Sequence, residues 1–164
     1  MSAGSGRIQV TAAGIALSGG KLTNTIGAGT DFPAAGTIIK TDFWNSAEIE
    51  GADCTLSTVT NDITINKTGK WRVHSRFYIS GGGDTDWSWT CFVYVNEGEA
   101  FRRVGFQTGS SANLTGASMG IDTMLVLASG DVVDIRGSVS NSADPVSPGG
   151  GSQDDLFEVI FLGT

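Results

Sequence analysis

Charged side chains, proline and cysteine are all scarce in this chain of 164 residues. Charged residues make up 16% of it, and it contains three prolines and two cysteines. Three prolines are too few for a proline-rich linker protein, and a hydrophobic content of 40% is too high for a disordered polar chain. Two cysteines fall far below the density of a disulfide-stapled secreted module. The composition therefore predicts a globular protein with a substantial core.

Long hydrophobic runs and a secretion signal are also absent. No apolar stretch approaches the roughly 18 residues that a transmembrane helix needs. Residues 1–20 lack a charged start followed by a compact apolar segment, which is the pattern of a signal peptide. We therefore expect synthesis in the cytoplasm and no membrane contact.

Basic residues are too few and too dispersed for general nucleic-acid binding. The chain has 10 Lys and Arg against 17 Asp and Glu, a formal net charge of −7, whereas phosphate contacts require clustered cations. Residues 1–40 contain three Lys or Arg and one Asp, a net charge of +2, so the rest of the chain carries −9. A slightly positive N-terminal segment thus precedes an acidic body, an asymmetry that suits docking on an acidic surface.

Residues that usually carry chemistry are sparse as well. His74 is the only histidine, and it falls on the polar face of an alternating strand pattern. Cys54 and Cys91 have neither a CxxC spacing nor a neighbouring histidine for metal binding, so buried free thiols are the expectation, with a pairing of the two left open. We predict no catalytic residues, no cofactor and no metal ligands, and therefore no enzyme.

Glycine, serine and threonine are abundant and dominate the first 36 residues. The whole chain has 24 glycines. In residues 1–36 glycines alternate with Ala, Ser, Thr and short apolar islands, a pattern that leaves no room for a helix of useful length. We predict an extended N-terminal arm over residues 1–36 that becomes ordered by docking on another surface. The arm side chains predicted to dock are Arg7, Ile8, Val10, Ile15, Leu17 and Lys21.

From residue 37 onward the sequence is typical of an all-β domain, which we assign to residues 37–164. Short β-branched and aromatic runs are separated by clusters of Gly, Asn, Asp and Ser. The predicted strands cover residues 37–44, 55–60, 63–66, 70–80, 87–95, 100–107, 121–127, 132–139 and 156–162. Residues 70–80 alternate apolar and polar with a period of two. Residues 91–95, 124–127 and 159–162 are apolar on both faces, which predicts a second subunit as the second cover.

Four motifs in this region resemble a known family. Gly-Lys-Trp-Arg-Val at 69–73 resembles the Gly-x-aromatic-x-Val strand opening of tumour-necrosis-factor-like and complement globular-head jelly rolls. Tyr-Val-Asn-Glu-Gly at 94–98 is similar to that family's strand ending in an Asn-Gly turn, with Glu97 inserted. Leu-Val-Leu-Ala-Ser-Gly-Asp-Val-Val at 125–133 resembles its Leu-x-Leu-x-x-Gly-Asp-x-Val turn, and Phe-Glu-Val-Ile-Phe-Leu at 157–162 resembles its terminal aromatic strand. The resemblance covers about residues 37–164.

The resemblance implies an all-β jelly-roll β-sandwich of about 8–10 antiparallel strands that forms a homotrimer around a threefold axis. A collagen-like stalk and a signal peptide are missing, which sets this chain apart from animal cytokines and complement proteins. Stalkless domains of this type resemble those of tailed-bacteriophage virion proteins. The side chains expected at the threefold axis are Phe92, Tyr94, Phe157 and Phe161.

The resemblance therefore implies a structural role in a virion. The expected function is that of a trimeric capsid decoration (cement) protein on the capsid exterior, docked through its arm on the major capsid protein. Three arms brought together by a trimer multiply weak contacts through effective concentration.

A second hypothesis is a receptor- or glycan-binding tip of a phage fibre or head spike. It would use the glycine-rich loop that contains Asp84 and Asp86, together with Trp87 and Trp89, which share one face of a strand. If that face points outward, the two indoles form a platform for sugar rings, and if it points inward they belong to the core.

Overall fold

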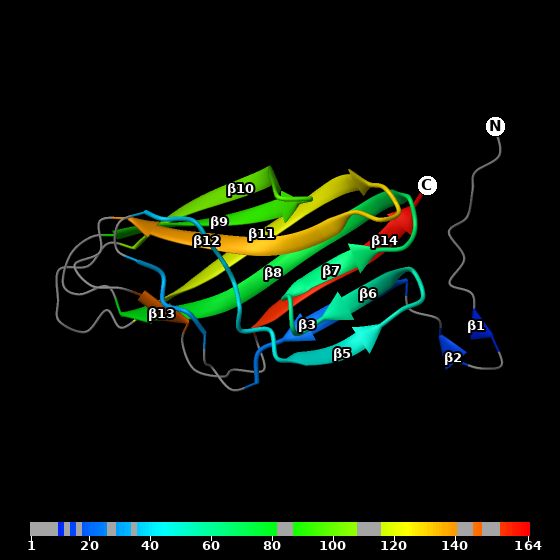
Figure 1. The fold of residues 1–164 in the computed structure, drawn as a ribbon, viewed down its shortest axis with the longest axis horizontal. Helices are drawn as coiled ribbons and strands as arrows, with labels where there is room; N and C mark the ends of the chain where they lie inside the picture. Colours follow the sequence, from blue (N-terminus) through cyan, green and yellow to red (C-terminus); the bar gives the residue numbers. More distant parts are fainter. Residues whose placement is uncertain are drawn as a thin grey trace.

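A computed structural model of the chain describes residues 10–11, 14–15, 18–25, 29–33, 36–81, 87–107, 116–140, 146–148 and 155–164. All of its regular structure is β-strand, and two antiparallel sheets pack face to face as a sandwich (Figure 1). The prediction of an all-β jelly-roll sandwich is confirmed.

One sheet, which we call the β8 sheet, has the strand order β11-β8-β14-β3-β5, with β13 paired to the end of β8. Its strands are β3 (Gly19–Thr23), β5 (Ser46–Glu50), β8 (Gly69–Gly81), β11 (Gly116–Leu127), β13 (Val146–Pro148) and β14 (Leu156–Gly163). The β9 sheet has the order β10-β9-β12-β7-β6, with β4 paired to β12. Its strands are β4 (Ile39–Lys40), β6 (Cys54–Ser57), β7 (Asp62–Ile65), β9 (Trp87–Val95), β10 (Gly98–Gln107) and β12 (Val132–Ser140). The two-residue strands β1 (Val10–Thr11) and β2 (Gly14–Ile15) pair with each other.

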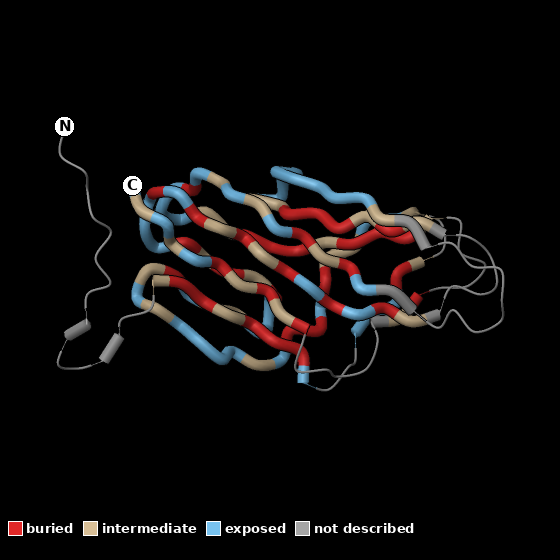
Figure 2. The backbone as a smooth tube through the Cα atoms, turned by 180° about the vertical axis from the view of Figure 1, so that it is seen from behind, coloured by how far each residue is buried: buried red, intermediate tan, exposed pale blue. Residues whose placement is uncertain are grey.

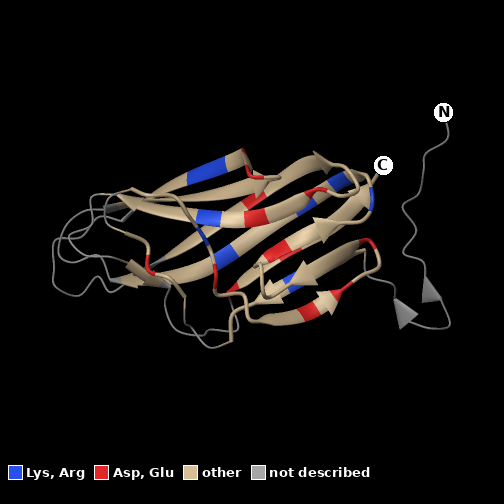
Figure 3. Cartoon of the chain, viewed as in Figure 1, with Lys and Arg blue, Asp and Glu red and all other residues tan. Residues whose placement is uncertain are grey.

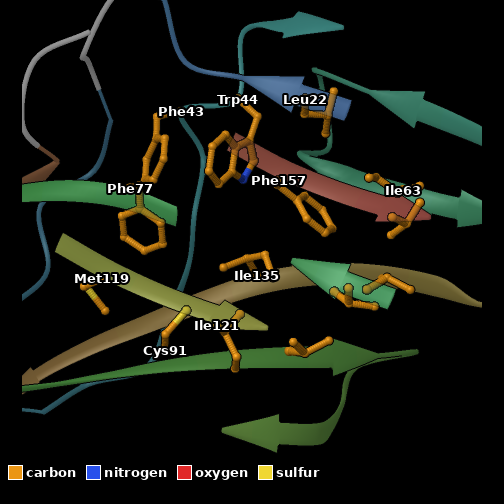
Figure 4. Close-up of a cluster of buried hydrophobic side chains, with 14 of the residues drawn as sticks. Leu22, Phe43, Trp44, Ile63, Phe77, Cys91, Met119, Ile121, Ile135 and Phe157 are labelled. Atoms are coloured by element: carbon orange, nitrogen blue, oxygen red, sulfur yellow. The ribbon is translucent and has the colours of Figure 1, made fainter. Parts of the chain in front are cut away.

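The core lies between the two sheets, where inward-facing positions of successive strands interdigitate. On β8 the predicted alternation holds: Trp71, Val73, Ser75, Phe77 and Ile79 are fully buried, while the residues that alternate with them face outward. The centre of the core is an aromatic cluster, in which the Phe77 ring lies 5.2 Å from the Phe43 ring between centroids (Figure 4). Figure 2 shows the buried positions in red along the strands of both sheets, interrupted by tan and pale-blue positions. Burial of this apolar surface supplies most of the folding free energy.

Part of the predicted N-terminal arm belongs to the sandwich, which corrects the boundary at residue 36. Strand β3 lies inside the β8 sheet between β14 and β5, and Leu22 is fully buried opposite Phe157. Further along, Phe32 is also fully buried, and its backbone exchanges hydrogen bonds of 2.8 and 3.0 Å with Val146. The described residues that lie outside the sandwich are therefore those before Ser18.

Glycine in β3 serves close packing, which is why the composition misled the prediction. A Cβ atom on Gly19 would lie 2.3 Å from the carbonyl oxygen of Val159. A Cβ atom on Gly20 would lie 2.5 Å from a methyl carbon of Leu56 on the opposite sheet. At such distances only glycine lets the neighbouring backbone and side chains approach.

The two cysteines are free thiols in different strands. Cys54 lies on β6 and Cys91 on β9, and β7 and β12 separate these strands in the sheet. Three strand spacings amount to about 14 Å, well beyond the reach of a disulfide. Burial raises the pKa of the Cys54 thiol to about 11 and that of the Cys91 thiol to about 12, so both remain protonated at neutral pH.

Candidate functional site

The outer face of the β8 sheet, which looks away from the core, carries a group of uncovered apolar side chains. They come from the outward positions of β11 and β14, on either side of β8. Their exposed fractions are 73% for Met124, 76% for Val126, 37% for Ile160 and 50% for Leu162. We call these four side chains the exposed apolar surface. Apolar groups gathered in this way on one face mark a surface for interaction.

The pairing register explains how these side chains come together. Arg72 of β8 lies opposite Met124 on one side and opposite Ile160 on the other, so the three form one row across the sheet. Val126 lies opposite Lys70 in the next row. Neighbouring strands are about 4.8 Å apart, so Met124 and Ile160 stand about 10 Å apart with an arginine between them.

A band of ion pairs crosses the same face beside the exposed apolar surface. The guanidinium of Arg72 donates two hydrogen bonds to Asp122, of 2.8 and 2.7 Å, and these hold the pKa of that carboxyl below its usual value. His74 Nδ1 lies 3.0 Å from Glu158 Oε1. Lys21 Nζ donates a 2.7 Å hydrogen bond to Glu48, which lowers the pKa of that carboxyl. Arg72 and Lys21 are thus each matched by an acid of the same protomer.

A hollow of about 160 Å³ continues this face toward β3 and β5. It is lined by Ser18, Gly19, Gly20, Lys21, Ile49 and Ile160, among others. Gly19, which pairs with the outward Ile160, contributes no side chain to this hollow. Because Ile160 belongs both to the hollow and to the exposed apolar surface, the two form one continuous, mainly apolar region.

The four aromatic residues predicted at the threefold axis do not share a surface, which corrects that prediction. Phe157 is fully buried between the sheets, so it cannot contact another subunit. Phe161 also faces inward, with its ring 5.1 Å from that of Trp71. Phe92 and Tyr94 lie on the outer face of the β9 sheet, on the far side of the molecule from β14.

The residues predicted for the capsid-docking arm separate into two groups. Lys21 is part of β3 and is paired with Glu48, so it belongs to the sandwich. Val10 pairs with Ile15 in the β1–β2 hairpin, which precedes the sandwich. Arg7, Ile8 and Leu17 lie outside the described residues.

The predicted ligand loop is described only in part. Asp84 and Asp86 lie outside the described residues, as does the side chain of Trp87, the first residue of β9. Trp89 faces inward, is 9% exposed, and packs its indole against Gly105, where a Cβ atom would lie only 2.1 Å from the ring. Trp89 is therefore a core residue and not an outward platform for a sugar.

Two motifs of the sequence resemblance meet at one end of the sandwich and hold its turns together. The β9–β10 turn places Asn96 and Glu97 at φ angles of 50° and 67°, as a two-residue hairpin loop requires. The Asn96 side chain donates a 2.7 Å hydrogen bond to Asp131 and accepts a 2.9 Å hydrogen bond from the Val132 amide. These motifs thus have a structural role.

The described part of the chain has neither a metal-binding group nor a membrane-spanning helix. Its His, Cys, Asp and Glu residues form no group of three that could hold a metal ion. Within the same ranges there is no helix long and apolar enough to cross a membrane.

Comparison with known proteins confirms the fold. The structure of Eiger, a tumour necrosis factor from S. frugiperda, superimposes with a TM-score of 0.62 at 15% sequence identity, covering 89% of this chain and 92% of Eiger. Murine APRIL superimposes with TM-scores of 0.57 for its structure at pH 5.0 and 0.56 for that at pH 8.0, in both cases at 11% identity over 88% of this chain. These alignments cover 99% and 98% of the APRIL chains.

The chain therefore has a tumour-necrosis-factor-like jelly-roll fold. No family model matches its sequence, and no curated protein matches it either. The likeness is thus one of architecture, and function has to be argued from this chain's own surfaces.

The sequence contained a signal for the exposed apolar surface but not its position. Residues 124–127 and 159–162 are apolar at consecutive positions, which predicted a second cover for both strands. Alternation alone did not say which residue of each pair faces outward. In the structure Met124, Val126, Ile160 and Leu162 lie on the outer face, whereas the prediction selected Phe157 and Phe161, which face inward, and Phe92 and Tyr94, which lie on the other sheet.

Proposed function

We propose that this chain is a structural virion protein, a homotrimeric capsid decoration (cement) protein on the capsid exterior whose partners are its own copies and the major capsid protein. The observation that carries the proposal is the exposed apolar surface. A soluble monomer gains nothing from leaving Met124 and Val126 uncovered, whereas an assembly gains from burying them.

Self-association through the β8 sheet gives the exposed apolar surface its second cover. The polar contacts beside it are made within one protomer, the Arg72–Asp122 ion pair and the contact of His74 with Glu158. Approach of another copy therefore leaves these groups with their partners. The sequence resemblance adds the threefold symmetry, which repeats one contact three times around an axis.

Docking on the capsid is assigned to the segment before the sandwich, residues 1–17. Its apolar residues and Arg7 stand among small side chains, and these allow an extended chain to lie close to a neighbouring backbone and to add to a sheet edge. A trimer presents three such segments on one shell, which multiplies a modest individual affinity.

Quantitative mass spectrometry of virions that carry this chain tests the proposal directly. Hundreds of copies in a simple ratio to the major capsid protein would support a decoration protein. A few copies in multiples of three would instead support the fibre-tip or spike-tip hypothesis, and absence from the particle would contradict both.

A deletion tests the docking segment separately. Removing residues 1–17 keeps every strand of the sandwich, whereas removing residues 1–36 would also remove β3 and Phe32. We expect the shortened protein to remain a trimer in solution and to lose co-sedimentation with capsids. The matched control replaces residues 1–17 by a Gly-Ser segment of equal length. Co-sedimentation of the shortened protein at the full-length level would place the capsid contact on the sandwich.

A further inference from the structure

His74, the only histidine of the chain, lies on the outer face of the β8 sheet between two carboxylates. Asp122 of β11 stands opposite it on one side and Glu158 of β14 on the other. The Nδ1 atom of His74 lies 3.0 Å from Glu158 Oε1, and the two side chains are only 26% and 23% exposed. The imidazole and this carboxylate are therefore already largely withdrawn from water in the single protomer.

The two carboxylates beside His74 differ in their other partners. Asp122 accepts both hydrogen bonds of the Arg72 guanidinium, and its pKa is lowered mainly by Arg72 and to a smaller extent by His74. Within the described part of the chain, Glu158 makes its hydrogen bond to His74, while Arg72 acts on it only at longer range. The charge of Glu158 therefore depends on His74 for a counter-charge in direct contact.

Histidine is the side chain whose charge changes between pH 5 and 8. A neutral imidazole can donate one hydrogen bond to Glu158, whereas a protonated imidazole supplies a hydrogen bond and an opposite charge. Water around the single protomer screens part of this difference, because both side chains keep some exposure.

The proposed contact between copies would remove that water. The row of the sheet next to His74 holds Met124, Arg72 and Ile160, so the imidazole borders the exposed apolar surface. A second copy that covers these apolar side chains also covers Glu158. Taking a carboxylate out of water is costly unless it is paired, so the contact favours the protonated state of His74.

The other charged groups that the structure describes on this face keep their charge over the same pH range. Lys70 and Arg76 lie on the outer side of β8, and Arg76 has an interaction of its own. Lys21 of β3 is paired with Glu48 of β5. Figure 3 shows the basic positions of β8 and the acidic positions of β5. Carboxylates, lysines and arginines ordinarily titrate outside pH 5.5–8.0, which leaves His74 as the group that responds there.

We propose that protonation of His74 strengthens the contact between copies, so that assembly of this protein tightens as the pH falls from 8.0 to 5.5. The inference rests on the proposed self-association through the β8 sheet. Its sign follows from linkage: a contact that favours protonated His74 takes up protons as it forms, so a lower pH favours the assembled state.

Sedimentation of the full chain over a dilution series at pH 5.5, 6.5, 7.5 and 8.0, at constant ionic strength, tests the proposal. The quantity measured is the chain concentration at which half of the protein is assembled. We expect this concentration to be at least tenfold lower at pH 5.5 than at pH 8.0. The rate at which labelled and unlabelled copies exchange gives a second measurement, and it should be faster at pH 8.0.

Variants of the two partners should change the pH dependence in different ways. His74→Gln stays neutral at every pH, so its half-assembly concentration should not depend on pH. Glu158→Gln should reverse the dependence, because protonation of His74 then places an unpaired charge in the contact. Glu99→Gln is the matched control, because it removes an exposed acid from β10 in the other sheet and should keep the dependence of the unaltered chain. Thermal unfolding at both pH values verifies that each variant is folded.

The possible failures separate the proposal from the proposed function. A half-assembly concentration that is equal at pH 5.5 and 8.0 would overturn the role of His74 and leave self-association in place. A dependence that persists in His74→Gln would assign it to another group, and a Glu158→Gln variant that keeps the original sign would remove Glu158 from the mechanism. A chain that stays monomeric at every pH would contradict both self-association and its regulation.

Discussion

The two outer faces of the sandwich differ in how far their apolar side chains are covered. On the β9 sheet, Phe92 is only 4% exposed, because the side chains of Arg102 and Arg136 flank it on the neighbouring strands and the Tyr94 ring packs against it. On the β8 sheet, Met124 and Val126 have no such cover. Arginine stems can shield apolar surface while their charged ends stay in water. Phe92 on the first face, which we call the closed face, is therefore covered within the protomer, whereas the second, open face leaves Met124 and Val126 for a partner.

The ion pairs of the two faces also differ in burial. On the closed face, Arg136 donates hydrogen bonds of 2.8 and 3.0 Å to the buried carboxylate of Asp134, contacts Glu97, and lies 4.0 Å above the Tyr94 ring. On the open face, Arg72 and Asp122 form a pair of similar geometry, but both side chains are largely in solvent. The two pairs have similar geometry, but removing Arg136 from the buried Asp134 should therefore lower the free energy of unfolding more than breaking the exposed Arg72–Asp122 pair.

The largest effect is expected when a charge is placed on the open face. Val126→Asp puts a carboxylate into the proposed contact between copies, opposite Lys70. Even with that cation beside it, the carboxylate has to lose its water on assembly, which costs several kcal/mol for each subunit. We expect the mass measured by light scattering to fall from three times the 17.0 kDa chain mass to that of a monomer. Val104→Asp is the matched control, because Val104 is half-exposed on the closed face.

Two outcomes would contradict the assignment of the contact between copies to the open face. If Val104→Asp dissociates the assembly and Val126→Asp does not, the contact lies on the β9 sheet. A monomeric unaltered chain at micromolar concentration would contradict self-association altogether.

The next effect concerns the closed face. Arg136→Ala leaves Asp134 buried without its bidentate partner, and we expect a loss of about 3 kcal/mol in the free energy of unfolding. Denaturation in urea measures this loss. Arg102→Ala, on the same face but paired only with exposed Glu99, should cost less than about 1 kcal/mol. Equal losses for the two variants would mean that the Arg136 network adds no stability of its own.

A smaller effect tests whether β3 is a packed strand of the open sheet. Gly19→Ala places a methyl group against the Val159 carbonyl, so the backbone has to shift, at a cost of about 1–3 kcal/mol. In Gly98→Ala the added methyl group lies 3.4 Å from its nearest neighbour, so this control should change stability by less than about 1 kcal/mol. If residues 19–23 were a loose arm, the two variants would unfold alike.

Strands with a strong alternating or β-branched pattern could be predicted from the sequence. The predicted strand at 87–95 coincides with β9, and the prediction for 70–80 differs from β8 by one residue at each end. Both depend on local signals, namely period-two alternation and turn residues at each end. The jelly-roll fold was predicted from the family resemblance of four motifs in order, whereas the strand patterns by themselves predicted only an all-β domain.

Strands that depend on distant neighbours could not be predicted. Strand β3 reads Gly-Gly-Lys-Leu-Thr and β5 reads Ser-Ala-Glu-Ile-Glu, and neither has the composition of a strand. Both form because β14 and β3 offer free edges to pair with. The orientation of residues 124–127 and 159–162 is likewise fixed by register, and a shift of one residue would exchange the inner and outer sets.

The smallest effect compares the exposed ion pair of the open face with the buried one of the closed face. The Arg72 guanidinium lowers the pKa of the Asp122 carboxyl in the folded protein. A carboxyl with a lowered pKa stabilises the fold above its unfolded pKa of about 3.9, and this contribution is lost as the pH falls through the lower folded value. Because the pair is exposed, Asp122→Asn should cost less than about 1 kcal/mol at neutral pH.

The pH dependence separates this charge effect from a packing effect. Unfolding in urea at about pH 6 and again at about pH 3 or below should show the cost of Asp122→Asn shrinking toward zero, because the unaltered carboxyl is then protonated as well. Asparagine keeps the size of the side chain and one acceptor oxygen, so a cost that stays constant with pH would come from the lost hydrogen-bond geometry. A cost at neutral pH as large as that of Arg136→Ala would mean that the open face is shielded from water in solution, and the assembled protein would then be the state to measure.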